Sequence, residues 1–172
     1  LAARDALTVR ALSTQEVGQA VVGVGGGIVG LAGSLGLVLG EGSTQALVRN
    51  AALDAGSGGI TVKADSRTDL DTIAGALGVG AAGFGITATV GLSGQQTLAE
   101  VRDSRLDASG STTVRADGDT TLDVHGATAA VAGGVGVAGT VDVQLLQGRT
   151  EARVAGASRL NSQASGDTAQ DV

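Results

Sequence analysis

The chain has 172 residues and a formal net charge of −6, with 30 Gly, one Phe and no Pro, Cys, Met, Trp or Tyr. Its 11 basic and 17 acidic side chains argue against a nucleic-acid-binding protein, which needs clustered Lys and Arg. Hydrophobic residues make up 42% of the chain, which excludes a disordered tract. With no Cys and one His, no zinc or transition-metal site of ordinary ligand count is expected.

An internal repeat of about 53 residues organises the whole chain. Three motifs recur at this spacing: T-V-R/K-A at Thr8, Thr61 and Thr113; A-x-V at Ala46, Ala99 and Ala152; and L-D-A at Leu53 and Leu106. We predict one repeat array over residues 1–172, with copies at residues 7–59, 60–112 and 113–166. Gly166-Asp167-Thr168 looks like the onset of a fourth copy, and neither end carries a polar capping unit. We therefore expect an internal segment of a longer protein.

In chain order, each copy begins with a strand-and-turn half. Residues 60–64 alternate apolar and polar side chains, which is the pattern of a half-buried strand. Turns are expected at Ser57-Gly58-Gly59, Ser109-Gly110-Ser111 and Gly118-Asp119, because such clusters end short strands. Strands of about five residues bounded by such turns are typical of a β-solenoid. We predict an all-β fold built as a parallel β-solenoid.

A long uncharged stretch rich in Gly and Ala follows in each copy, at residues 17–40, 72–99 and 126–141. A membrane-spanning helix needs about 20 apolar residues, and the first two stretches are long enough. Gly costs about 1 kcal/mol relative to Ala inside a helix, however, and Gly25-Gly26-Gly27 multiplies that cost. No belt of Trp, Tyr, Lys or Arg flanks the stretches. We expect buried strands or a tightly packed Gly/Ala layer, leave short helical pieces open, and expect no contact with a membrane.

The length of one copy leaves two arrangements open. A β-helix coil takes on the order of 20–30 residues, so each copy predicts either two coils or one coil with an enlarged leg. In both arrangements, small inward residues permit close backbone approach, and hydrogen bonds between coils satisfy the main chain. The absence of Pro agrees with this, because Pro cannot donate to a central ladder.

No residue pattern predicts a catalytic or cofactor site, and we expect no enzyme. His125 is the only histidine, its Val124-His125-Gly126 context has no counterpart in the other copies, and we interpret it as a surface or lining residue. No G-x-S-x-G motif accompanies it. The spacing Gly25-x-Gly27-x-x-Gly30 matches the dinucleotide fingerprint only formally, because the chain is so rich in Gly.

Acidic residues follow the T-V-R/K-A strands of the second and third copies. They are Asp65, Asp69 and Asp71, which recur as Asp117, Asp119 and Asp123. The calcium-binding nonapeptide and the EF-hand spacing are both absent. We interpret the cluster as a solvated acidic turn and predict no metal site.

The T-V-R/K-A strands, the Gly/Ala-rich middle, the A-x-V strands and the L-D-A turns together resemble repeats of very large bacterial exoproteins. These are the filamentous-haemagglutinin-like adhesins and the leukotoxin-like giant surface proteins. The resemblance covers essentially the whole chain. It implies a right-handed parallel β-helix stalk that is exported and used in adhesion, aggregation or biofilm formation, and it carries no catalytic residues.

These observations predict a structural or adhesive stalk segment of a secreted bacterial cell-surface protein. The expected partners are neighbouring repeats of the same chain, further copies in a homo-oligomer, and a host or cell-surface ligand; no nucleic acid and no cofactor are expected. One alternative is a subunit or segment of a self-assembling extracellular filament or sheath, in which exposed faces stack between chains. Another is a membrane-active, leukotoxin-like repeat whose Gly/Ala stretches enter bilayers.

Overall fold

A computed structural model of the chain describes residues 1–161 and 170–171. Its strands are β1 (Leu7–Arg49), β2 (Ala52–Asp54), β3 (Ile60–Arg102), β4 (Arg105–Asp107), β5 (Thr112–Ala155), β6 (Arg159–Leu160) and β7 (Gln170–Asp171). The predicted all-β fold with parallel sheets is confirmed, and the described residues form no helix in the Gly/Ala-rich stretches. The predicted fourth-copy onset at Gly166-Asp167-Thr168 lies outside the described residues.

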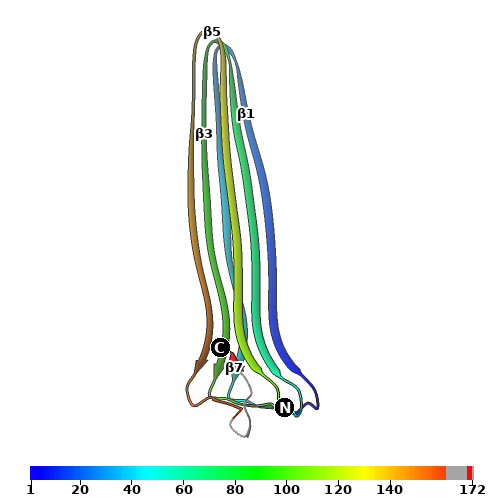
Figure 1. Ribbon diagram of the computed structural model, residues 1–172. Coiled ribbons are helices and arrows are strands. Elements are labelled where there is room, and N and C mark those ends of the chain that lie inside the picture. The colour runs from blue at the N-terminus through cyan, green and yellow to red at the C-terminus, as the bar shows by residue number, and fades with distance from the viewer. Residues whose placement is uncertain (162–169, 172) are drawn as a thin grey trace.

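Each long strand rises from the base of the molecule, folds over at a tip and returns to the base (Figure 1). In β3 the rising part is residues 60–79, here termed the ascending leg, and the returning part is residues 82–102, the descending leg. The short strands form a separate sheet in the order β2-β4-β6, while the long strands follow the order β1-β3-β5-β7. One copy of the repeat therefore makes one coil with an enlarged leg, and not two coils.

Successive coils pair in parallel along the whole length of the long strands. β1 pairs with β3 from Leu7↔Ile60 at one end to Arg49↔Arg102 at the other, and both strands have 43 residues. Because the strands are continuous, the prediction of short strands of about five residues is wrong for the legs. The backbone of the middle coil therefore finds its hydrogen-bond partners in the coils on either side.

The tip absorbs the difference in length between β3 and β5. β5 has 44 residues where β3 has 43, and the pairing changes register only between Gly80 and Ala82. Gly80 lies opposite Ala132 and Ala82 lies opposite Val135. The third coil thus carries its additional residue at the turn of the tip, and both legs keep their pairing.

The apolar core lies at the base, where inward side chains of the legs meet those of the short strands. In the middle coil Ile60, Val62, Val101 and Leu106 are fully buried. The predicted alternation over residues 60–64 is confirmed, because the residues between the buried positions are half-exposed. Branched aliphatic side chains of this kind fill the base and stabilise it by removing apolar area from water.

Toward the tip the two legs approach so closely that only glycine fits at several inward positions. A Cβ on Gly25 or on Gly78 would overlap the backbone of the opposite leg. Gly27, at the turn of the first coil, has a φ of 148°, which L side chains rarely adopt. The spacing of Gly25, Gly27 and Gly30 is therefore explained by the geometry of the tip and does not form a nucleotide-binding loop.

The corner after each descending leg is a left-handed residue. Asn50, Asp103 and Gly156 have φ values of 49°, 48° and 68°, and each directly follows the end of a long strand. Asn, Asp and Gly are the residues that tolerate this conformation best. The Asp103 carboxylate also accepts a hydrogen bond of 2.9 Å from the amide of Ala157 in the next coil.

Two turn predictions hold and one is wrong. Turns or bends fall at Ser57-Gly58-Gly59 and at Ser109-Gly110-Ser111, whereas Gly118-Asp119 lies inside β5. Gly118 faces the interior, where a Cβ would overlap the side chain of Thr150 on the opposite leg. A glycine that keeps two legs close together therefore resembles a turn signal in the sequence.

Among the described residues, no helix could span a membrane.

Replacing Gly78 with Val should destabilise the stack, because the new side chain would collide with the backbone of the opposite leg. Overpacking of this kind costs roughly 1–3 kcal/mol, so the midpoint of urea unfolding should fall. Gly139→Val is the matched control, since a Cβ at Gly139 meets no atom within 4 Å. Equal midpoints for the two variants would contradict the close approach of the legs.

Candidate interaction surface

The outward side of the middle coil changes character between base and tip. Near the base, the ascending leg of β3 presents Lys63, Asp65, Arg67, Asp69 and Asp71. Beyond Asp71 the outward residues of this leg carry no charge up to the tip. The strand therefore has a charged part and an uncharged part on one continuous backbone.

The descending legs present an apolar surface that spans the coils. The register stacks similar side chains in columns: Leu31–Phe84–Val137, Leu37–Val90–Val143 and Leu39–Leu92–Leu145. The exposure is not an effect of the ends of the stack, because it also holds in the middle coil, where Ile86 is 67% exposed. Stacked apolar side chains of this kind form a continuous hydrophobic patch.

The ascending legs are apolar at the same height. Ile73 and Val79 of the middle coil are 51% and 41% exposed. We term the outward residues from 73 to 92 of β3, together with their register partners on β1 and β5, the distal apolar surface. It covers both outward sides of the stack and the tip between them.

The interior at this height is small and partly polar. Its buried inward side chains in the middle coil include Thr72, Ala74, Ala76, Thr87, Thr89 and Ser93. The Thr87 hydroxyl accepts hydrogen bonds from Ser34 at 3.2 Å and from Thr128 at 2.8 Å, so the hydroxyl groups of three coils are linked. The usual arrangement of a water-soluble protein, apolar inside and polar outside, is present at the base and reversed toward the tip.

A carboxylate bound by three arginines joins the coils near the base. Glu100 has no exposed side-chain area and lies against Arg49, Arg102 and Arg153. Arg49 donates through Nε at 3.0 Å, and the Arg102 Nε lies 3.5 Å away. Arg153 belongs to the next coil, as Arg49 belongs to the previous one. Hydrogen bonds from Arg153 and then from Arg49 lower the pKa of Glu100 from 4.5 to about 2.

The acidic residues of the ascending legs lie on strands, so the expected acidic turn is wrong, and Asp65, Asp69 and Asp117 form ion pairs. Lys63 contacts Asp65 at 2.8 Å and Asp117 of the next coil at 3.2 Å, and Arg10 contacts Asp65 at 2.8 Å. The hydrogen bond from Lys63 is the main cause that lowers the pKa of Asp65. The described residues contain no group of three His, Cys, Asp or Glu placed to hold a metal ion.

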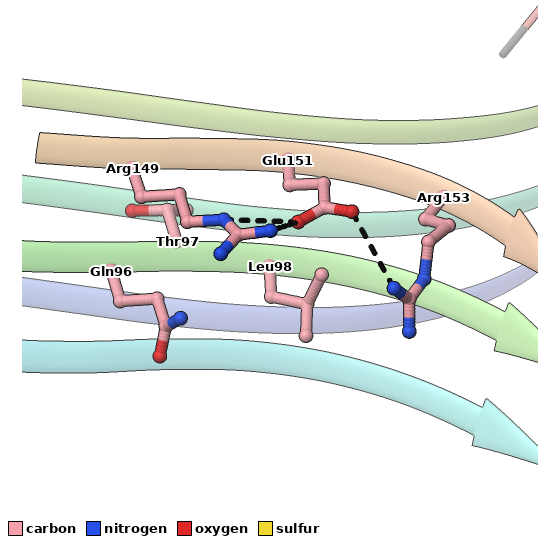
Figure 2. A pocket seen from close by; sticks show the side chains of 6 residues that line it. All are labelled: Gln96, Thr97, Leu98, Arg149, Glu151 and Arg153. Carbon is pink, nitrogen blue, oxygen red and sulfur yellow. Dashed lines mark hydrogen bonds and ion pairs between the residues drawn. The ribbon is translucent and has the colours of Figure 1, made fainter.

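Two hollows on the surface lie at the charged end of the legs. Figure 2 shows one of about 170 Å³ lined by Gln96, Thr97, Leu98, Arg149, Glu151 and Arg153. Glu151 pairs with Arg149 at 2.7 Å and with Arg153 at 3.7 Å, so the charges that line the hollow are already engaged. Ligand pockets usually measure about 300–1,000 Å³, so the hollow in Figure 2 is smaller than a usual ligand pocket. A wider, open hollow of about 540 Å³ lies on the ascending legs beside Asp65, Asp117 and Asp119.

His125 lies on the outward side of the ascending leg of β5, where it is exposed and in register with Ile73. Its place on the surface agrees with the interpretation as a surface residue. The feature that sequence reasoning missed is the distal apolar surface. The signal for it was present, because Val22-Gly23-Val24-Gly25 alternates large and small residues.

Comparison with models of known protein families, with curated proteins and with solved structures finds no match to this chain.

Lowering the pH should weaken the stack through Glu100. Its pKa is below the ordinary value of 4.5, at about 2, so its contribution is complete above pH 4.5 and is lost as the pH falls toward 2. We expect the free energy of unfolding of the wild-type chain to decrease over this window. Glu100→Gln should be less stable at neutral pH and should lose part of this pH dependence in urea titrations at pH 6 and pH 3.

Glu41→Gln is the control, because Glu41 is an exposed carboxylate on the descending leg of β1. We expect its pH dependence to follow that of the wild-type chain. A Glu100→Gln variant that shows the same pH dependence as the wild type would contradict the role assigned to the three arginines.

Proposed function

We propose that this chain is a structural and adhesive segment of a large bacterial cell-surface protein, in which stacked coils form a stalk. The observation that supports it most is the parallel pairing of β1, β3 and β5 along both legs, which is interrupted only at the tip. Coils that contact only their neighbours add length without a change of fold. Such an array suits a spacer that projects or presents a repetitive surface outside the cell.

Ion pairs between coils support the same proposal. Arg49, Glu100 and Arg153 come from three successive coils, and Lys63 reaches Asp117 of the coil that follows it. Exposed single ion pairs contribute little, but a shared carboxylate with little solvent access is bound more tightly. The pairs fix each coil laterally against the next, which is what a stalk of many copies requires.

Displaying the chain on the surface of a non-aggregating bacterium tests the proposal. We expect cells that display the wild-type chain to settle together and to stay on a surface under flow several-fold more than cells with the empty carrier. Cells that display Gly78→Val at the same level should lose this effect, because the coil stack is disturbed, while Gly139→Val should retain it.

Two outcomes would contradict the stalk. One is display at full level without any aggregation or adhesion. The other is a purified chain that grows into long polymers in electron micrographs without any surface, which would make it a filament subunit. Sedimentation of the purified chain over a range of concentrations separates a monomeric segment from such a polymer.

A further inference from the structure

The distribution of polar and apolar side chains on the legs indicates the surroundings in which the tip lies. In the middle coil, which is flanked on both sides, Ile73, Val79 and Ile86 are exposed while Thr72 and Thr87 are fully buried. At the base of the same strand, Ile60 and Val62 are buried and the charged residues point outward. Base and tip therefore suit two different surroundings, water for the base and an apolar medium for the tip.

The apolar medium has to reach every outward side of the tip. The descending legs present columns such as Leu37–Val90–Val143, the ascending legs present Ile73 and Val79, and the turn between them presents Ile28, which is 85% exposed. A single protein partner on one side would leave the other side in water. A hydrocarbon phase covers both sides and the turn at the same time.

On the ascending legs, the height of the uncharged zone matches a bilayer. The outermost charges of the ascending legs are Glu16, Asp71 and Asp123, and nine residues separate Asp71 from the turn at Ala81. At about 3.3 Å per residue this part of the leg is about 30 Å long. The hydrocarbon core of a bilayer is also about 30 Å thick.

The middle coil also meets the demands of a lipid environment. Its backbone groups are paired with the coils on either side, as lipid requires, whereas β1 and β5 are each paired on one side only at this height. Apolar residues outside and small polar residues inside alternate along each leg, as on strands that face lipid. Asp142, the one acidic residue at this height among the described residues, lies at an inward register position of the last coil, where it is exposed and accepts a hydrogen bond of 3.3 Å from the amide of Gly126.

We propose that the distal apolar surface inserts tip-first into a lipid bilayer, with the charged base left in water. The acidic residues at the boundary favour zwitterionic over anionic lipid, because Asp71 and Asp123 would be repelled by a negative surface. This membrane contact goes beyond the proposed stalk. The sequence predicted no membrane contact and left entry of the Gly/Ala stretches into bilayers as an alternative, and the inserting element inferred here is a pair of strand legs instead of a helix.

Flotation of the complete chain with phosphatidylcholine vesicles tests the insertion. We expect the wild-type chain to float with the vesicles. Ile86→Glu places a charge on the distal apolar surface and should lower the bound fraction at least tenfold, because charge facing hydrocarbon is strongly disfavoured. Leu98→Glu is the matched control, since Leu98 lies on the same leg beyond the boundary and should bind like the wild type.

A fluorescent reporter shows which part enters the lipid. The chain has no Trp, so Phe84→Trp near the tip and Leu98→Trp near the base each report one position. We expect a blue shift and quenching by brominated lipid for Phe84→Trp, and neither for Leu98→Trp. Circular dichroism and a urea titration in buffer confirm that each variant is folded.

Three results would overturn the insertion: a chain that stays in the aqueous phase, equal binding of Ile86→Glu and wild type, or a shift at Leu98→Trp but not at Phe84→Trp. Oligomers that form without vesicles and are abolished by Ile86→Glu would assign the surface to a second copy of the chain, and also overturn it. The adhesion of displayed cells does not depend on vesicle binding, so the two experiments test the proposed stalk and the proposed insertion separately.

Discussion

The narrow gap between the two legs of each coil is the constraint on which the rest of the structure depends. Parallel pairing between coils fixes the path of every leg, and the opposite leg then leaves little room for inward side chains. Gly25 and Gly78 have no space for a Cβ, and Thr87 is completely enclosed. The gap explains why Gly occupies these inward positions, because larger side chains find room only at the base or outside.

Because the gap between the legs holds only small side chains, the large apolar side chains lie on the outward side of the legs. At the base, where the short strands hold the legs apart, Ile60 and Leu106 fill a conventional core and charges stay in water. Higher up, Val90 and Leu92 turn outward on the same strand. The ion pairs around Glu100 lie near the base, where outward positions are polar. Chain spacing alone therefore divides the molecule into two chemically distinct parts.

The sequence predicted the fold class and the period well, because the T-V-R/K-A strands at Thr8, Thr61 and Thr113 are in register and carry regular alternation. It left the long legs open as one of two arrangements and predicted strands of only about five residues. Gly is a weak strand former and a strong turn signal, so Gly118 was assigned to a turn although it lies opposite Thr150. The cluster at Glu100 was also hidden, since its column reads Leu47, Glu100 and Arg153 and no single copy shows the charge pairing.

The additional residue at Gly133-Gly134 shows where a repeat copy can gain a residue during evolution. An insertion within a leg would shift every later side chain to the opposite side and break the pairing with both neighbours. At the turn, the added residue leaves the rest of β5 aligned, from Val135 opposite Ala82 to Ala155 opposite Arg102. Insertions and deletions at the tip therefore leave the pairing of the legs intact. The length of the legs can differ between copies while the base keeps the same structure.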